Sequence, residues 1–477
     1  MIRASGLRCL TAGLASAIAL APGLALNVCP VAQAIAPPVV DPTVSPPSGA
    51  AGPVQAMEQR GQCAVSGVLA GTDPGVPTSS QTTLNLPAAW QFSRGEGQLV
   101  AVLDTGVRPG PRLSAVEAGG DFVESTDGLT DCDGQGTLVA GLIAGQPAPS
   151  GEDGFSGVAP AARVLSVRVT SAKFSPRAAG GGDPAQARAT LDVTALGRAI
   201  VRAADLGARV IDISATTCVP ADRPVEQATL GAAIRYAAVD KDAVIVAAAG
   251  NTGPTGSVAG GTSCESNPLT DLSRPDDARN WAGVRSVSIP SCWQPYVLSA
   301  AALTPGGQPS KFTMAGPWVG VAAPGESVVS LSNRDGGGLA NGLPDDRGNL
   351  VELTGTSYAA GYVAGVAALV RSKYPALTAA QVMHRISATA HNGARSPSNL
   401  VGSGTVDPVA ALTWDLPADA GAPAGAPVRP VSVPPAPAPK DTTPRTVALV
   451  GLAALAALVG VAATYAISAR RRKEPTS

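Results

Sequence analysis

Three side chains of this sequence are of types that act on peptide bonds, and each stands at the boundary of an apolar run. Ser357 opens a long apolar helix, whose free backbone N–H groups and dipole stabilise a developing oxyanion. Asp104 follows the run 99–103, at the end of an expected parallel strand, where open α/β sheets bind their ligands. Asn251 follows the run 244–250 and could supply a second oxyanion donor through its amide. These residues predict a serine peptidase site.

The expected site lacks a base, because Gln135 stands where the order Asp, base, Ser would place one. A histidine there accepts the serine proton near neutral pH and later returns it to the leaving amine. A glutamine amide is far too weak a base for this step. Loss of the base costs on the order of 10⁶ in kcat, or roughly 8 kcal/mol of transition-state stabilisation.

Few other side chains could replace that base. The chain has two histidines, His384 and His391, on or at the end of the helix expected after the Ser357 helix. We expect both at the surface and far from Asp104. The carboxylates Asp131 and Asp133 lie near Gln135 in sequence, but their loop should point them away from Ser357.

Gln135 could still have a structural role. Its NH₂ group could donate to Asp104 while its oxygen accepts from Ser357, which would keep the bridge without proton transfer. Asp104-Thr105-Gly106 also matches an aspartic-protease signature, but that fold needs a second triplet or a dimer, and the sequence holds no second copy. Taken singly, Asp104 and Asn251 would be turn or cap residues, and Ser357 a plain helix N-cap.

Length and charge bound the class of protein. The 477 residues suffice for one large domain with appendages or for two ordinary domains. Charge is nearly balanced, with 34 Lys and Arg against 35 Asp and Glu, so we expect no nucleic-acid partner. No pattern in the sequence indicates a metal or cofactor.

The two ends predict an exported, anchored protein. Arg3 and Arg8 precede an apolar run and a small-residue cleavage site, which predicts a signal peptide over residues 1–34. Residues 447–469 form an uncharged apolar stretch long enough to span a bilayer. The basic residues 470–473 follow it directly, so the positive-inside rule predicts a cytoplasmic tail at 470–477 and an extracytoplasmic domain.

The cysteines agree with export. Two of the seven lie in the expected signal peptide, which leaves Cys63, Cys132, Cys218, Cys264 and Cys292. An odd number in an oxidising compartment allows at most two bridges and one leftover thiol. The sequence by itself leaves all fifteen ways of choosing two pairs open.

Short β-branched runs alternate with amphipathic segments over residues 84–416, which predicts an α/β domain with a parallel sheet flanked by helices. Before it, 35–83 predicts an extended N-terminal extension that Cys63 could tie down, and after it, 417–446 predicts a Pro-rich spacer. We expect a long loop at 171–190. Expected strands are 98–103, 163–169, 208–213, 243–248, 296–302 and 319–322. Expected helices are 137–144, 193–206, 230–239, 357–373 and 378–390.

The motifs together resemble the subtilisin family and, more closely, the mycosins, which are membrane-anchored subtilisin-like proteases associated with type VII secretion systems of actinobacteria. The resemblance covers nearly the whole chain, including the spacer and the terminal apolar stretch. It rests on residues 32–35, 37–42, 131–133, 136–140, 157–160, 247–251, 316–319 and 355–360. The sequence departs from the family at Gln135.

The resemblance implies a role for each matching residue. Asp104 would orient the base, Ser357 would be the nucleophile, and Asn251 would help to bind the oxyanion.

The resemblance also implies two disulfides. Cys63 would bridge to Cys132, beside the expected active-site loop, and Cys218 would bridge to Cys264. Cys292 has no partner in that scheme, and we expect it to be a small buried side chain.

Two functions follow from the resemblance. The first is a pseudoprotease, a membrane-anchored component of a type VII secretion complex impaired by Gln135. The second is an active serine endopeptidase that processes secreted proteins with a relocated or substrate-supplied base.

Overall fold

The computed structural model describes residues 35–149, 151–177, 183–253, 264–393, 397–417 and 443–471. The chain divides into two compact units, residues 1–422 and 423–477. The expected signal peptide, most of the spacer and most of the cytoplasmic tail lie outside the described residues.

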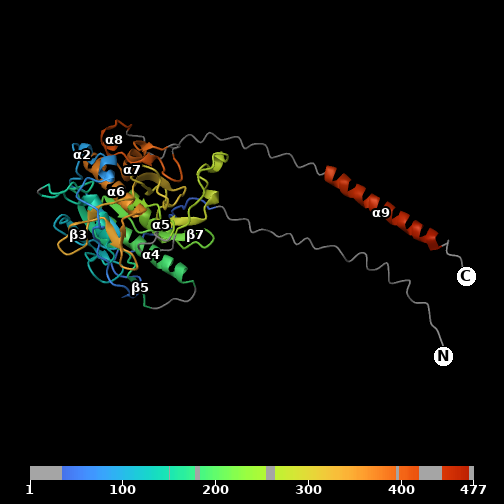
Figure 1. The fold of residues 1–477 in the computed structure, drawn as a ribbon, viewed down its shortest axis with the longest axis horizontal. Helices are drawn as coiled ribbons and strands as arrows, with labels where there is room; N and C mark the ends of the chain where they lie inside the picture. Colours follow the sequence, from blue (N-terminus) through green and yellow to red (C-terminus); the bar gives the residue numbers. More distant parts are fainter. Residues whose placement is uncertain are drawn as a thin grey trace, which may run out of the picture. The chain divides into compact units, whose positions relative to one another are not determined.

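A nine-stranded sheet forms the centre of the first unit (Figure 1). Its order is β16-β17-β11-β10-β8-β6-β2-β4-β3, and every pair is parallel except β16 with β17. Its strands are β2 (Leu99–Asp104), β3 (Val116–Asp121), β4 (Arg163–Arg168), β6 (Val210–Ile213), β8 (Val244–Ala248), β10 (Val297–Leu303), β11 (Val319–Pro324), β16 (His391–Asn392) and β17 (Gly404–Thr405).

The predicted parallel α/β fold is confirmed, and all six expected strands are present within two residues of their predicted ends. Strands buried on both faces read as continuous apolar runs, which made them visible in the sequence. The five expected helices are also present. They are α3 (Gln135–Ala144), α4 (Pro184–Asp205), α5 (Ala228–Arg235), α6 (Thr356–Lys373) and α7 (Ala379–Ala388).

The long loop predicted at 171–190 is wrong at both ends. Phe174–Pro176 forms β5, which pairs with β1 (Met57–Gln59) of the N-terminal extension. From Pro184 the chain is already helical, because the Asp183 side chain accepts from Ala185 N and proline is tolerated in the first turn.

The remaining elements are short. They are α1 (Ser79–Thr83), α2 (Leu86–Ala89), β7 (Thr217–Pro220), the π-helix η1 (Tyr236–Asp240), the 3₁₀ helices η2 (Pro275–Asp277) and η3 (Trp281–Gly283), β9 (Ser286–Ile289), β12 (Ser330–Leu331), β13 (Leu339–Ala340), β14 (Gly342–Pro344), β15 (Leu350–Glu352) and α8 (Pro408–Thr413).

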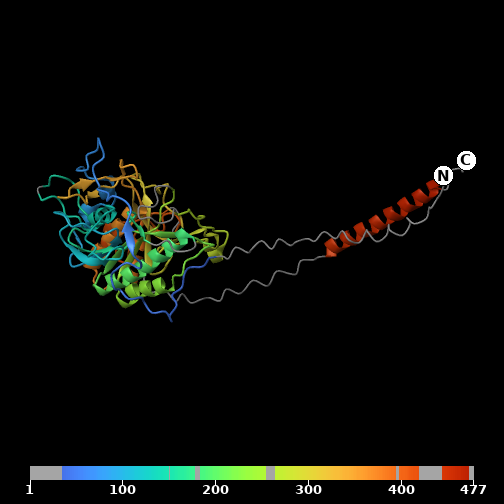
Figure 2. The same cartoon turned by 90° about the horizontal axis from the view of Figure 1, so that it is seen from below.

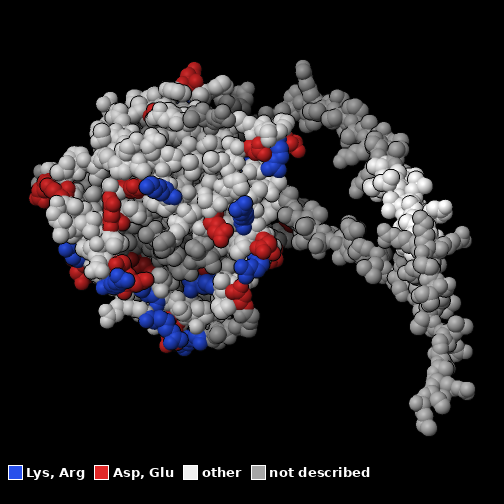
Figure 3. Space-filling view, turned by 45° about the vertical axis from the view of Figure 1, so that its right-hand side comes forward, with Lys and Arg blue, Asp and Glu red and all other residues white. Residues whose placement is uncertain are grey.

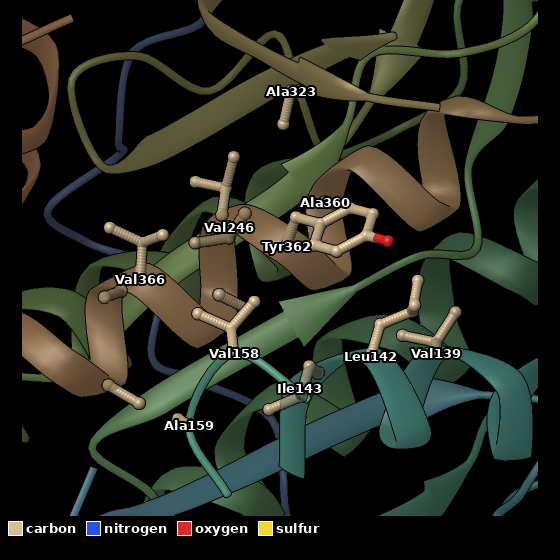
Figure 4. Packing of buried hydrophobic residues seen from close by; sticks show 14 of the residues in the cluster. Val139, Leu142, Ile143, Val158, Ala159, Val246, Ala323, Ala360, Tyr362 and Val366 are labelled. Atoms are coloured by element: carbon tan, nitrogen blue, oxygen red, sulfur yellow. The ribbon is translucent and has the colours of Figure 1, made fainter. Parts of the chain in front are cut away.

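Two apolar cores lie on opposite faces of the sheet. Residues of α3, α6 and α7 belong to one, and residues of α4 and α5 to the other. In β2, Val100 and Val102 face the first core, while Ala101 and Leu103 face the second. Helix α6 is buried from Thr356 to Arg371 and runs beside α3, as the side chains in Figure 4 show. This burial fixes where the first turn of each helix lies.

The N-terminal extension wraps over the domain as mostly irregular chain, seen in blue in Figure 2. Its β1 pairs with β5, and Gly67 forms a bridge with Gly342. Ser66 N donates to Asn333 Oδ1 over 3.0 Å. These contacts attach the extension to the α/β domain, as the cysteine at position 63 led us to expect.

The second unit contains α9 (Thr443–Arg471). Ala448–Ala469 is long and apolar enough to cross a membrane, close to the expected 447–469. Its described side chains carry no charge, whereas charges of both signs are interspersed over the domain face seen in Figure 3.

Candidate active site

The four residues singled out in the sequence all stand at the ends of core elements. Asp104 is the last residue of β2, and Asn251 lies three residues beyond β8. Gln135 is the first residue of α3, and Ser357 is the second of α6. All four side chains are buried. The carboxyl ends of parallel strands and the N-termini of the helices that cover them meet at one edge of the sheet.

Asn251 is held with its amide nitrogen toward the serine. Its Oδ1 accepts from the N and the Oγ1 of Thr356, each over 2.9 Å. A Cβ added to Gly355 would lie 3.0 Å from Ser357 Oγ and 3.5 Å from Asn251 Nδ2, so both atoms border the same space. Glycine at 355 keeps that space open for a substrate atom. The arrangement can bind an oxyanion with one side-chain donor and the α6 N-terminus.

Gln135 is bonded to the aspartate. Its Nε2 donates to Asp104 Oδ2 over 3.2 Å, and its buried Oε1 has no hydrogen-bond partner among the described residues. A bond between their chain neighbours holds Gln135 beside Asp104, since Gly136 N donates to Thr105 Oγ1 over 2.9 Å. One half of the expected bridge is therefore present, but the bond from Ser357 to Gln135 is absent. Among the described residues, no hydrogen bond joins the Ser357 hydroxyl to a side chain that could take its proton.

Burial controls the charge of Asp104. Removal from water, with the nearby Asp131 charge adding to it, raises the pKa of the Asp104 carboxyl to about 7. Hydrogen bonds from Thr105 N, at 2.6 Å, and from Gln135 act in the opposite direction. Among the residues described around it, the aspartate has no cationic partner to keep it ionised.

Asp131 and Asp133 organise the loop before Gln135. Asp131 Oδ1 accepts from Thr105 Oγ1 at 2.8 Å, and its Oδ2 from Thr137 Oγ1 at 2.6 Å. Asp133 Oδ2 accepts from Ser171 Oγ at 2.5 Å. Burial raises the pKa of Asp131 to about 6 and also raises the pKa of Asp133. No hydrogen bond joins either described carboxylate to Ser357, as we expected.

The histidines are far from the site. His384 is exposed on α7, and His391 is 42% exposed in β16, where its Nδ1 lies 3.6 Å from Asp407 Oδ2. In the sheet order, β16 is six strands from β2, which at about 4.8 Å per strand is roughly 29 Å from Asp104. Neither histidine can serve as the base.

The structure places another carboxyl at the site, which the sequence reading missed. Asp212 of β6 pairs in register with Val102, so its side chain shares a sheet face with Asp104. Its Oδ2 accepts from Ser214 Oγ at 2.6 Å, and its Oδ1 is unpaired within the described chain. Burial, with the Asp104 charge, raises the pKa of Asp212 well above its usual value. A lone Asp inside an apolar strand was the available signal.

The buried carboxyls predict a pH-dependent stability. The folded chain binds protons that the unfolded chain releases between pH 3.8 and about 7, so the free energy of unfolding falls as pH rises through that window. Asp104→Asn should flatten this slope in urea unfolding measured from pH 4.5 to 7.5. The surface control Asp346→Asn should leave it unchanged. Equal slopes for both variants would contradict the assignment.

Asn251 offers a test of the oxyanion pocket. In a Gln135→His background, Asn251→Ala should lower kcat by roughly 10²–10³ while changing KM little, because the donor acts mainly on the transition state. Steady-state hydrolysis of a peptide p-nitroanilide measures both constants. A loss confined to KM would assign Asn251 to ground-state binding instead.

Both expected disulfides are present, Cys63–Cys132 and Cys218–Cys264. Cys132 lies three residues before Gln135, so the first bridge ties the N-terminal extension to the active-site loop. Cys292 is buried without a disulfide, and burial raises the pKa of its thiol to about 12. That thiol is too weakly acidic to act as a nucleophile near neutral pH.

The sequence matches the subtilase family over residues 95–404. It is 71% identical to mycosin-3 of Mycobacterium tuberculosis (strain ATCC 25618 / H37Rv) over 447 residues, 94% of this chain and 95% of that protein. Mycosin-1 of the same strain is 45% identical over 454 residues, 94% and 98% of the two chains.

Solved structures agree with these matches. The MycP3 protease from the type VII (ESX-3) secretion system superposes with a TM-score of 0.76 at 64% identity, covering 80% of this chain and all of that one. A chain of an intact ESX-5 inner membrane complex gives a TM-score of 0.76 at 45% identity, covering 91% of this chain and all of that one.

Proposed function

Because the chain belongs to the subtilase family and, within it, to the mycosins, we propose that it is a membrane-anchored component of a type VII secretion system whose peptidase activity is severely impaired. One observation carries the impairment. Gln135 bonds to Asp104 at the position of the base, and among the described residues no hydrogen bond joins the Ser357 hydroxyl to an imidazole or a carboxylate.

The relatives support the secretion role. Structures that resemble this chain include the ESX-3 protease, an intact ESX-5 inner membrane complex, and the periplasmic assembly of that complex. In the last two, a protein of this fold is held in a membrane assembly. The span Ala448–Ala469 gives this chain the means to join one.

The proposed topology has the subtilase domain outside the cytoplasmic membrane. It rests on the expected signal peptide at 1–34, the two disulfides, and the basic residues that follow the apolar span. Residues 470–477 would then be cytoplasmic.

Fluorophosphonate labelling of the full-length chain in detergent tests the impairment. Ser357 of the unaltered protein should react at least about 100-fold more slowly than in Gln135→His, since the nucleophile lacks a base. Ser357→Ala in each background is the control for labelling elsewhere. Comparable labelling of the unaltered protein and Gln135→His would refute the impairment.

Complementation tests the secretion role. In cells that lack the endogenous gene, the unaltered chain and Ser357→Ala should restore export of the system's substrates equally. Removal of residues 447–469 should abolish that restoration. Restoration by the unaltered chain but not by Ser357→Ala would show that export needs the nucleophile.

The second candidate is an active serine endopeptidase that acts on secreted proteins with a relocated or substrate-supplied base. The orientation of Asn251 favours it, because Thr356 fixes the amide with its nitrogen beside the Ser357 hydroxyl. A chain that only binds has no need of this arrangement. Substantial labelling of the unaltered chain would favour this candidate.

A further inference from the structure

The strand that leads to Ser357 has one unpaired edge. β15 pairs antiparallel with β14, and Gly67 of the N-terminal extension flanks the other side of β14. Along the described chain, nothing pairs with the opposite edge of β15. Leu350 and Val351 of β15 are 37% and 46% exposed. An open strand edge of this kind is a template for another extended segment.

The register shows which backbone groups are free. Leu353 N donates to Asn341 O over 3.1 Å, and Asp345 N donates to Asn349 O over 2.8 Å. In an antiparallel pair, inward-bonded and outward-facing residues alternate, so Val351 is bonded to β14 between these two positions. Leu350 and Glu352 therefore direct their N–H and C=O groups away from β14.

The hairpin is held before any ligand arrives. Gly67 N donates to Gly342 O over 3.0 Å, and Gly342 N donates back to Gly67 O over 3.0 Å. At the turn, Asp345 Oδ1 accepts from Arg347 N and Asn349 N, each at 2.9 Å. Because this edge is already formed, less conformational entropy is lost when another strand pairs with it.

The edge runs into the candidate active site. Glu352 is five residues before Ser357, and Gly355 N donates to Gly325 O over 2.9 Å, which fixes the segment between them. A polypeptide that pairs with β15 is thereby directed along the chain that carries the nucleophile.

The chemistry of the edge selects the occupant. The hairpin carries Asp345, Asp346 and Glu352 against Arg347, so it favours a segment that bears Lys or Arg. Leu350 and Val351 on β15 add apolar surface. A second copy of this chain would bring the same acidic hairpin and repel.

We propose that the free edge of β15 is a docking strand that captures an extended, basic polypeptide segment of a partner by backbone pairing. The proposal rests on the proposed function in one respect, since a site without a base holds such a segment without cutting it. β15 thus gives the impaired site a binding role.

A peptide and two substitutions at one position test this. The probe is fluorescein-labelled Lys-Val-Thr-Val-Thr-Val-Thr-Lys, bound to full-length Ser357→Ala protein in detergent so that cutting cannot interfere, and read by fluorescence anisotropy. Glu352→Pro should weaken binding at least about 10-fold, because it removes an outward N–H without breaking a bond to β14. Glu352→Ala keeps the N–H and should change binding less than about threefold.

Two further measurements distinguish the loss of the outward N–H from misfolding of the Glu352→Pro variant. Thermal unfolding of Glu352→Pro should match that of Glu352→Ala. A probe N-methylated on alternate residues should bind the Ser357→Ala protein at least about 10-fold more weakly than the plain probe, a loss that requires no change to the hairpin.

The proposal would be overturned if the probe did not bind. It would also be overturned if Glu352→Pro and Glu352→Ala bound the probe equally and the methylated probe bound as tightly as the plain probe. A dimer of the full-length chain that Glu352→Pro dissociates, without probe binding, would make a second copy the occupant and also overturn it. Since the binding protein lacks the nucleophile, none of these outcomes depends on whether the unaltered chain cleaves peptides.

Discussion

Gln135→His should raise the kcat for peptide hydrolysis by about 10⁴–10⁶, the largest effect expected of any single substitution in this chain. In the unaltered chain, no hydrogen bond joins the Ser357 hydroxyl to a proton acceptor among the described residues, while Asp104 and Asn251 already occupy useful positions. An imidazole at 135 would donate one N–H to Asp104 in place of the glutamine Nε2 and present its other nitrogen toward the serine. The assay is steady-state hydrolysis of a peptide p-nitroanilide by purified full-length protein.

The same variant should change the protonation of Asp104. In the unaltered chain, burial raises the pKa of that carboxyl to about 7, and no cation among the described residues offsets it. In Gln135→His, the imidazolium formed during the reaction supplies the missing charge. The rate of this variant should therefore rise with pH as the introduced imidazole loses its proton. The unaltered chain should show no such rise, because the amide of Gln135 does not titrate.

Two controls define this gain. Gln135→His with Ser357→Ala should return hydrolysis to the level of the unaltered chain, which excludes a contaminating peptidase. Gln135→Asn should gain nothing, because it retains an amide. A rate for Gln135→His within tenfold of the unaltered rate would show that the site is blocked for a reason other than its base.

The sheet could be predicted from the sequence because its central strands lie between two helical layers. Strands β2, β6 and β8 are buried along their whole length and are apolar apart from Asp104 and Asp212, which made them visible in the sequence. β3 was missed, since Gly119 and Gly120 break its apolar pattern. A Cβ at Gly119 would lie 2.5 Å from Ser166 O, so close approach to β4 requires that glycine.

The sequence could indicate a site residue only where that residue stands at the boundary of an apolar element. Asp104 and Ser357 stand at the end or the start of apolar elements, and this made them visible. Asp212 could not be linked to Asp104, because their proximity depends on β6 lying beside β2, which sequence spacing does not encode. The sequence also could not show that Gln135 bonds to Asp104 but not to Ser357, because this depends on which atoms the Gln135 side chain can reach inside the packed site.

Removing the bridge between Cys63 and Cys132 should lower the free energy of unfolding by about 4 kcal/mol, because it frees a loop of 69 residues in the unfolded chain. The double variant Cys63→Ser with Cys132→Ser avoids a stray thiol. Urea unfolding without reductant measures the change. The matched control is Cys218→Ser with Cys264→Ser, whose separation of 46 residues predicts a similar entropic loss.

Limited proteolysis separates the two variants. The first bridge is part of the attachment of the N-terminal extension, together with the bond from Ala64 N to Cys132 O at 2.8 Å and the Asn333 side chain, which donates to Ala64 O and Asp131 O. Only its loss should expose the extension to cleavage. A change below about 1 kcal/mol, or equal cleavage of both variants, would contradict this role.

The same variant shows what positions residue 135. Asp131 is held by Thr105 and Thr137 independently of the disulfide, through bonds of 2.8 and 2.6 Å. The loop should therefore keep residue 135 beside Asp104 after the bridge is lost. In the Gln135→His background, we expect the disulfide variant to lose stability while kcat at low temperature changes less than about threefold. A large fall in kcat would instead make the extension a positioning element of the site.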